Sequence, residues 1–265
     1  MPLRRLAASL LLAPLLACAA PADTFHWPAG IQAAVSLAYD DALDSQLDNA
    51  IPALDRAGLR GSFYLQLSNP SVARRMGEWR AAAAHGHELG NHTLFHQCSH
   101  AVPGHEWVQP QRDLDNTSVA QMADQVWLGN TLLQALDGRT ARTLTVPCGD
   151  RLAQGQDYLP AVRAGFVAIK AGAGPAVAPS MAALDPYAVP VLAPVGLSGA
   201  ELIALVKQAQ AQGSMANFTF HGVGGDYLSV SSAAHAELLD YLAAHRAEVW
   251  TDTFLNLMQY VKSQR

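Results

Sequence analysis

Two histidines stand four residues apart in the segment His92-Thr93-Leu94-Phe95-His96. On a helical turn, imidazoles at this spacing lie on one face and can both reach a single divalent ion. Such pairs also arise by chance, and a polar loop with one histidine hydrogen-bonded to the backbone is the alternative interpretation. The pair therefore indicates a metal site only in combination with other ligands.

Two aspartates, Asp40 and Asp41, directly follow the apolar run at 33–39, which is typical of a buried strand. Successive strand residues point in opposite directions, so one carboxylate can bind a metal while its neighbour faces a bound water. Burying both is costly unless a cation or hydrogen bonds compensate, and a solvated helix N-cap is the alternative. Asp41 with His92 and His96 would form a two-histidine, one-carboxylate site that suits zinc, and also cobalt, nickel or iron.

A further histidine, His221, follows the apolar run Phe218-Thr219-Phe220 and precedes a glycine-rich segment. A lone histidine at a strand end is more often structural, but the glycines let a ligand approach, and acyl transfer requires an acid near the leaving group. The segment Gly222-Val223-Gly224-Gly225 lacks the lysine of a phosphate-binding loop. Likewise, Gly196-Leu197-Ser198-Gly199 lacks the spacing of a nucleophile elbow, which disfavours a serine esterase.

Strands that alternate with helices must position these side chains, and this alternation predicts an α/β fold with a parallel sheet and outer helices. We expect strands at 33–39, 61–67, 87–90, 142–146, 166–169, 216–220 and 249–250. We expect helices at 48–57, 72–84, 119–136, 159–164, 201–212, 233–245 and 253–261. The stretch 92–116 shows no period, and 171–194 is a Pro- and Ala-rich crossing. The polar residues then follow strand ends, where α/β barrels build their active sites.

The first 22 residues have the pattern of an export signal, because two arginines precede an apolar run at 6–17 and small residues follow it. The run is too short for a transmembrane anchor. A lipoprotein site at Cys18 is the weaker alternative, since the residue two positions before it is a bulky leucine. We therefore expect an exported protein, periplasmic or secreted, with 23–265 as a single catalytic domain.

The net charge of −5, with scattered basic residues, disfavours nucleic acid as a partner. Export would leave Cys98 and Cys148 in a compartment that permits disulfides. From the residues alone, one bridge and two unpaired buried thiols both remain open.

Taken together, the motifs resemble those of the polysaccharide deacetylases, carbohydrate esterase family 4, also called the NodB homology domain. Ser36-Leu37-Ala38-Tyr39-Asp40-Asp41 resembles the first motif of that family, and Gly86-His87-Glu88-Leu89-Gly90-Asn91-His92-Thr93-Leu94-Phe95-His96 resembles the second. Phe218 to Gly222 resembles the last, and the similarity runs from about Trp27 to Tyr260. The resemblance implies a deformed (β/α)7-type barrel with parallel strands and outer helices.

The resemblance also implies roles for single residues. Asp40 would be the general base, His221 the general acid, and Asp41, His92 and His96 the ligands of a divalent metal. The chain would then be a metal-dependent hydrolase that deacetylates an N- or O-acetylated carbohydrate.

Residues at the rim of the expected pocket would complete the site. The backbone N–H of Cys148 would hold the oxyanion. Tyr227, together with Trp107 and the loop at 96–116, would form an aromatic wall for the sugar. Because both cysteine-bearing loops should rim one pocket in this family, the resemblance favours a Cys98 to Cys148 disulfide.

Two positions depart from the family pattern and favour a divergent branch. Thr145 stands where the third motif carries an arginine that orients the catalytic aspartate. Arg142, Arg151 and Lys170 are the candidates to replace that cation. The fourth motif, an aspartate with a tryptophan that lines the pocket, has no counterpart at 165–194. These departures keep open an alternative function, a carbohydrate-binding protein that retains the deacetylase fold without its activity.

Overall fold

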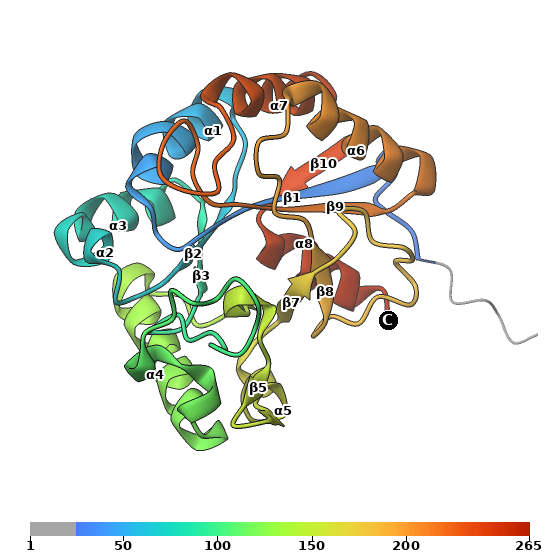
Figure 1. The fold of residues 1–265 in the computed structure, drawn as a ribbon. Helices are drawn as coiled ribbons and strands as arrows, with labels where there is room; N and C mark the ends of the chain where they lie inside the picture. Colours follow the sequence, from blue (N-terminus) through green and yellow to red (C-terminus); the bar gives the residue numbers. More distant parts are fainter. Residues whose placement is uncertain (1–24) are drawn as a thin grey trace, which may run out of the picture.

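The computed structural model describes residues 25–265, so the export signal expected at 1–22 lies outside the described residues. Strands and helices alternate along the chain (Figure 1). The strands are β1 (Ala33–Asp40), β2 (Ser62–Leu65), β3 (Glu88–Asn91), β4 (Thr143–Thr145), β5 (Leu152–Ala153), β6 (Gln156–Asp157), β7 (Ala168–Ala173), β8 (Val189–Val191), β9 (Met215–Phe220) and β10 (Val249–Asp252). The helices are α1 (Ile51–Ala57), α2 (Pro70–Arg74), α3 (Met76–Ala84), α4 (Val119–Asp137), α5 (Leu159–Val162), α6 (Gly199–Gln212), α7 (Ser232–Ala244) and α8 (Phe254–Ser263).

One eight-stranded sheet curls into a nearly closed barrel, and its strand pairs are parallel. The strand order is β1-β2-β3-β4-β7-β8, and β9 pairs with the other edge of β1. A parallel bridge between Leu192 and Phe218 links the chain after β8 to β9 and completes the ring. β10 lies outside this ring, against the first half of β1. The predicted (β/α)7-type barrel with parallel strands, outer helices and a single domain is confirmed.

Alternation along the strands divides the core into an outer and an inner layer. On β1, Val35, Leu37 and Tyr39 pack outward in the cluster shared with α1, α6 and α7. Ala34 and Ala38 belong to the inner cluster, which also includes apolar residues of α8. α8 thereby closes the N-terminal end of the barrel, opposite the strand ends that carry the polar residues.

The barrel interior also contains buried polar side chains, which is unusual for a barrel core. They are Ser36, Ser62, Glu88, Thr143, Thr145, Lys170, Asn217 and Thr219. Glu88 accepts hydrogen bonds from Ser62 Oγ at 2.6 Å and from the backbone N of Leu255 at 3.0 Å, and so caps the first turn of α8. The barrel interior therefore contains hydrogen-bonded polar groups in addition to packed apolar side chains.

Some local elements differ from the predictions. The segment 171–194 contains the strand β8, whose central Pro190 hides the strand pattern. The helix predicted at 72–84 is broken at Arg75, whose guanidinium binds Asp44, Asp48 and Glu78. A π-helical turn, Gln46–Ala50, precedes α1, and the short hairpin β5-β6 was not predicted. Within 25–265, no helix is both long and apolar enough to cross a membrane.

Candidate active site

Polar residues converge at the C-terminal ends of the barrel strands. Asp40 ends β1, His92 follows β3 and His221 follows β9, although these strands are far apart in sequence. A cavity of about 690 Å³ opens between them. Its wall includes each catalytic, metal-binding and substrate residue expected from the sequence: Asp40, Asp41, His92, His96, Cys148, His221 and Tyr227.

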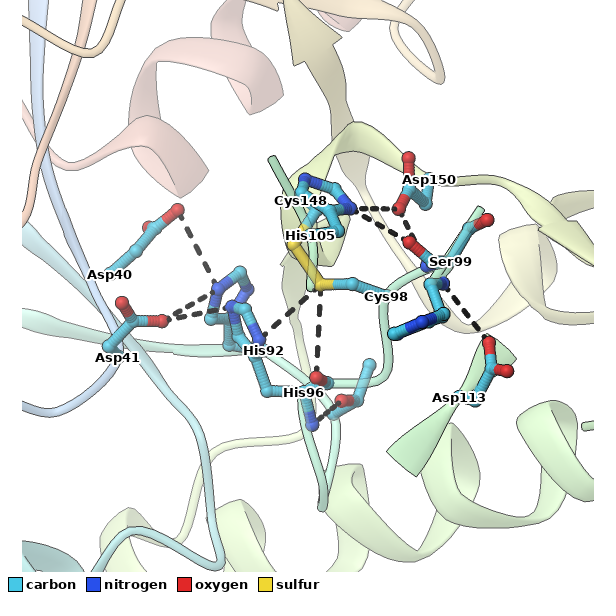
Figure 2. Close-up of a disulfide and its surroundings, with 12 residues drawn as sticks. Asp40, Asp41, His92, His96, Cys98, Ser99, His105, Asp113, Cys148 and Asp150 are labelled. Atoms are coloured by element: carbon cyan, nitrogen blue, oxygen red, sulfur yellow. Dashed lines mark hydrogen bonds and ion pairs between the residues drawn. A yellow bond between two sulfur atoms is a disulfide. The ribbon is translucent and has the colours of Figure 1, made fainter. Parts of the chain in front are cut away.

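One carboxylate oxygen of Asp41 faces both imidazoles of the second motif (Figure 2). Its Oδ1 is 3.2 Å from His92 Nε2 and 3.2 Å from His96 Nε2, and one ligand atom of each residue lies within 4.8 Å of the others. Tetrahedral zinc with bonds of about 2.1 Å separates its ligand atoms by about 3.4 Å. Asp41 Oδ1 is buried and has no hydrogen-bond partner among residues 25–265. The donor set and its spacing therefore fit a divalent cation.

A hydrogen bond fixes the orientation of His92. Its Nδ1 lies 2.8 Å from the carbonyl oxygen of Thr145, and since a carbonyl only accepts, Nδ1 carries the proton and donates. Nε2 is left to face Asp41, as in histidines that bind metals. Burial opposes the charged form of His92, but Asp40 and Asp41 raise its pKa to about 9. For Asp41, burial is outweighed by His92 and His96, which hold its pKa well below the ordinary value.

The expectation that His92 and His96 share a helical turn is wrong. The segment is a bend in which Thr93 and His96 have positive φ angles of 61° and 53°. Two side chains support the bend: Asn91 Oδ1 accepts from Thr93 N at 2.7 Å, and Thr93 Oγ1 accepts from His96 N at 3.0 Å. Asp41 also has a positive φ, of 81°. Backbone of this kind costs energy at non-glycine residues and concentrates at functional sites.

The two proposed proton carriers flank the ligand set. Asp40 Oδ2 lies 3.9 Å from His92 Nε2, and His221 Nε2 lies 3.8 Å from Asp41 Oδ2. Burial raises the pKa of Asp40, and the nearby imidazoles only partly oppose it. A raised pKa makes a carboxylate a stronger base near neutral pH.

Gln46 ties these two residues together, because its amide donates to the carbonyl oxygens of Asp40 and His221. No sequence pattern indicated a role for Gln46, which lies in the π-helical turn before α1.

Cys98 and Cys148 form a disulfide beside the imidazole of His96, as Figure 2 shows. Cys98 Sγ lies 3.6 Å from His96 Nδ1. Cys148 has a φ of 56°, in a turn where the N–H groups of the next two residues are hydrogen-bonded to backbone carbonyls. Among the described residues, the N–H of Cys148 has no such partner, which leaves it available to a ligand in the cavity.

Aromatic side chains stand at the mouth of the cavity. Trp107 is 54% exposed, and its ring centroid lies 6.3 Å from that of His96. Tyr227 is 52% exposed and hydrogen-bonds to Asp41. His105 also lines the cavity and lies against Trp107, but the aperiodic loop that carries it gave no hint of this role. The region without a fourth motif contributes small and apolar side chains to the wall: Gly172, Ala173, Val191 and Ala193.

The three cations considered as replacements for the third-motif arginine lie in different places. Arg142 binds Asp137 at 2.6 Å, and Arg151 is paired with Asp157. Lys170 is fully buried inside the barrel.

This chain belongs to the polysaccharide deacetylase family, whose sequence model matches residues 29–162. Comparison with curated proteins gave no significant match. Several solved structures share the fold at low sequence identity.

A Mycobacterium smegmatis protein, assigned by its name to the polysaccharide deacetylases, has a TM-score of 0.61 at 14% identity, and the match covers 92% of this chain and 95% of that one. The peptidoglycan deacetylase PdaC from Bacillus subtilis has a TM-score of 0.52 at 15% identity, with 88% and 92% covered. A mutant of a family pseudoenzyme from Bacillus anthracis has a TM-score of 0.51 at 14% identity, with 84% and 66% covered. The shared fold thus occurs in proteins named as enzymes and as a pseudoenzyme.

Proposed function

We propose that this protein is a metal-dependent hydrolase that removes N- or O-linked acetyl groups from a poly- or oligosaccharide. The observation that carries the proposal is the convergence of Asp41, His92 and His96 at ligand spacing in the wall of a cavity. The cation would most simply be zinc, with cobalt, nickel or iron compatible with the same donors. The export pattern at 1–22 supports action outside the cytoplasm, periplasmic or secreted.

When bound, the divalent ion would lower the pKa of a water and polarise the acyl carbonyl. As the water oxygen attacks the acyl carbon, Asp40 accepts the proton that the water loses. The Cys148 N–H donates to the carbonyl oxygen as negative charge develops on it. His221 then donates a proton to the departing nitrogen or oxygen, which yields acetate and a free amine or hydroxyl. Trp107 and Tyr227 offer rings against which a sugar can pack.

The test compares His92→Ala and His96→Ala with His100→Ala, which removes an exposed imidazole from the same loop. We expect the first two variants to lose bound metal and acetate release, and the third to retain both. Substrates are chitooligosaccharides, peptidoglycan and acetylated xylan, each assayed after metal removal and after addition of zinc, cobalt, nickel or iron(II). Unchanged metal content and turnover in His96→Ala would exclude the proposed site.

A second candidate is a carbohydrate-binding protein without deacetylase activity. Thr145 favours it, because this position has no cation to orient the base. Metal-loaded protein that binds an acetylated oligosaccharide in calorimetry, yet releases no acetate from the substrates above, would support this candidate over the enzyme.

A further inference from the structure

Lys170 carries an ammonium group inside the barrel, where charged groups are rarely found. The residue is 0% exposed. Its Nζ lies 3.4 Å from Ser36 Oγ and faces two aromatic rings, at 5.2 Å from the centroid of Tyr64 and 4.6 Å from that of Phe254. Burying an ammonium is costly unless nearby negative charge compensates. The groups around Lys170 should therefore show why the charge is retained.

The strand register places Lys170 beside the third-motif position. On β7, Lys170 is the direct partner of Thr145 on β4. Both side chains point into the barrel, since their neighbours Leu144 and Ile169 pack outward in another cluster. A cation attached at 170 thus enters the barrel at the level of position 145, from the adjacent strand.

Two buried carboxylates partly offset the cost of burying the ammonium, Asp40 toward the cavity and Glu88 toward α8. Glu88 already accepts hydrogen bonds from Ser62, Thr143 and the backbone of Leu255. Asp40, by contrast, has a buried Oδ1 without a hydrogen-bond partner among the described residues.

The path from Lys170 to Asp40 runs along one face of β1. Ser36 and Asp40 lie on that face with only the methyl group of Ala38 between them. The ammonium contacts β1 at Ser36, four residues before Asp40, and so lies beneath the base in the barrel interior. Burial lowers the pKa of Lys170 to about 8, and Asp40 and Glu88 oppose that effect, so the group is still protonated at neutral pH.

We propose that Lys170 is the positioning residue of Asp40 and supplies, from β7, the positive charge that Thr145 does not supply from β4. This inference rests on the proposed function. Arg142 and Arg151 are not alternatives, because each is already paired with its own aspartate. Lys170 acts on the reaction only through the orientation and charge of Asp40.

The first test is Lys170→Met, which keeps the length of the side chain and removes the charge. We expect kcat to fall by about 10- to 100-fold, the range expected for a misplaced catalytic group, with KM within about twofold. Bound zinc should remain at the wild-type level. Lys262→Met is the matched control, because Lys262 also faces an aromatic ring, that of Tyr187, but lies outside the site. It should leave kcat unchanged.

Further variants separate charge from packing. Thr145→Arg in the Lys170→Met background places a cation at the strand partner of position 170. We expect its kcat to be at least about tenfold higher than that of Lys170→Met, on the order of the loss caused by removing the lysine charge. If Lys170→Met does not fold, Glu88→Gln/Lys170→Met removes both members of the buried pair and is compared with Glu88→Gln. The inference is overturned if the kcat of Lys170→Met stays within about twofold of the wild type, or that of the double variant within about twofold of Glu88→Gln. It is also overturned if arginine at position 145 gives no recovery.

Crystal structures of the wild type and Lys170→Met give a readout that does not depend on activity. We expect the Asp40 carboxylate to change its orientation in the variant, and an unmoved carboxylate overturns the inference. Absence of acetate release from the metal-loaded wild type would instead contradict the proposed function. The two failures are therefore distinguishable.

Discussion

The Tyr227 hydroxyl donates a 2.9 Å hydrogen bond to Oδ2 of Asp41, the aspartate whose other oxygen faces the two histidines. Asp41 follows the first barrel strand, and Tyr227 belongs to the loop after β9. The contact therefore joins the segments that follow two paired strands, β1 and β9, at the wall of the cavity. Outer partners of this kind orient a ligating carboxylate and tune its affinity for metal.

Tyr227→Phe removes this hydroxyl and keeps the ring. We expect the affinity for zinc to fall by about tenfold, at the lower end of the usual effect of such partners. Competitive titration against a chelator at fixed pH measures the change. Tyr187→Phe is the control, since its hydroxyl contacts Lys262 outside the site. Equal zinc affinity in Tyr227→Phe and wild type would show that Asp41 is held by other contacts.

Gly90 gives space to the ring of Tyr64 inside the barrel. A Cβ at this position would lie 2.4 Å from Tyr64 Cδ1, far below contact distance. We expect Gly90→Ala to lower the free energy of unfolding by about 1–3 kcal/mol, because the ring has to move within a packed core. Urea unfolding measures this value. In Gly77→Ala, where nothing lies within 4 Å of the added group, stability should be unchanged or slightly raised. Equal stability of the two variants would contradict the prediction.

The disulfide joins two residues that are 50 positions apart in the sequence, and it lies against His96. We expect Cys98→Ala/Cys148→Ala to lower the free energy of unfolding by about 2–4 kcal/mol, because the unfolded chain gains freedom. The metal affinity should fall as well, since the segment carrying His96 loses its anchor. A reductant should reproduce both effects in the wild type and change nothing in the double variant. Wild-type protein that is as stable reduced as oxidised would contradict the expectation.

His235 is buried, and its Nε2 shares a 2.6 Å hydrogen bond with the Tyr39 hydroxyl. Burial lowers its pKa to about 4, below the ordinary value of 6.5. Between these two values the unfolded chain binds the proton more tightly than the folded chain does, so stability falls as the pH falls through this window. The slope is about 1.4 kcal/mol per pH unit, or about 3 kcal/mol in all.

His235→Gln removes the proton site, while its amide can still hydrogen-bond to the Tyr39 hydroxyl. We expect the unfolding free energy of this variant to depend less on pH between 6.5 and 4. The difference in slope should correspond to the binding of about one proton. Urea unfolding at several pH values, with a chelator present, measures the difference. His100→Gln, an exposed control, should keep the wild-type slope. Parallel curves for His235→Gln and wild type would contradict the assignment.

The alternating pattern of strands and helices was sufficient to predict a parallel sheet with outer helices, because each long element keeps its apolar period, and the resemblance to the family added the barrel. β8 escaped prediction since it is only three residues long and contains Pro190. The interior polar residues also weakened the strand pattern: Lys170, a charged residue inside β7, does not look like a core position. In both cases tertiary contacts, rather than local preference, determine the structure.

The candidate ligand set could be named from the sequence because Asp41, His92 and His96 lie in motifs with recognisable neighbours. Their local geometry could not, since the bend at Thr93 depends on the side chain of Asn91. Gln46 and His105 contact the site through long-range packing and carry no local signal. The register between Thr145 and Lys170 is likewise a property of paired strands, and a linear motif cannot contain it.

Phe25 and Trp27 pack with Trp250 and Tyr260 at the N-terminal ends of the strands, and the Trp27 indole donates to the carbonyl of Gly213 before β9. The described chain therefore starts at the pole opposite the cavity. A tether joined on that side would hold the molecule with its binding mouth directed outward. An immobilised form linked through its N-terminal side should therefore leave the mouth of the cavity open to solvent.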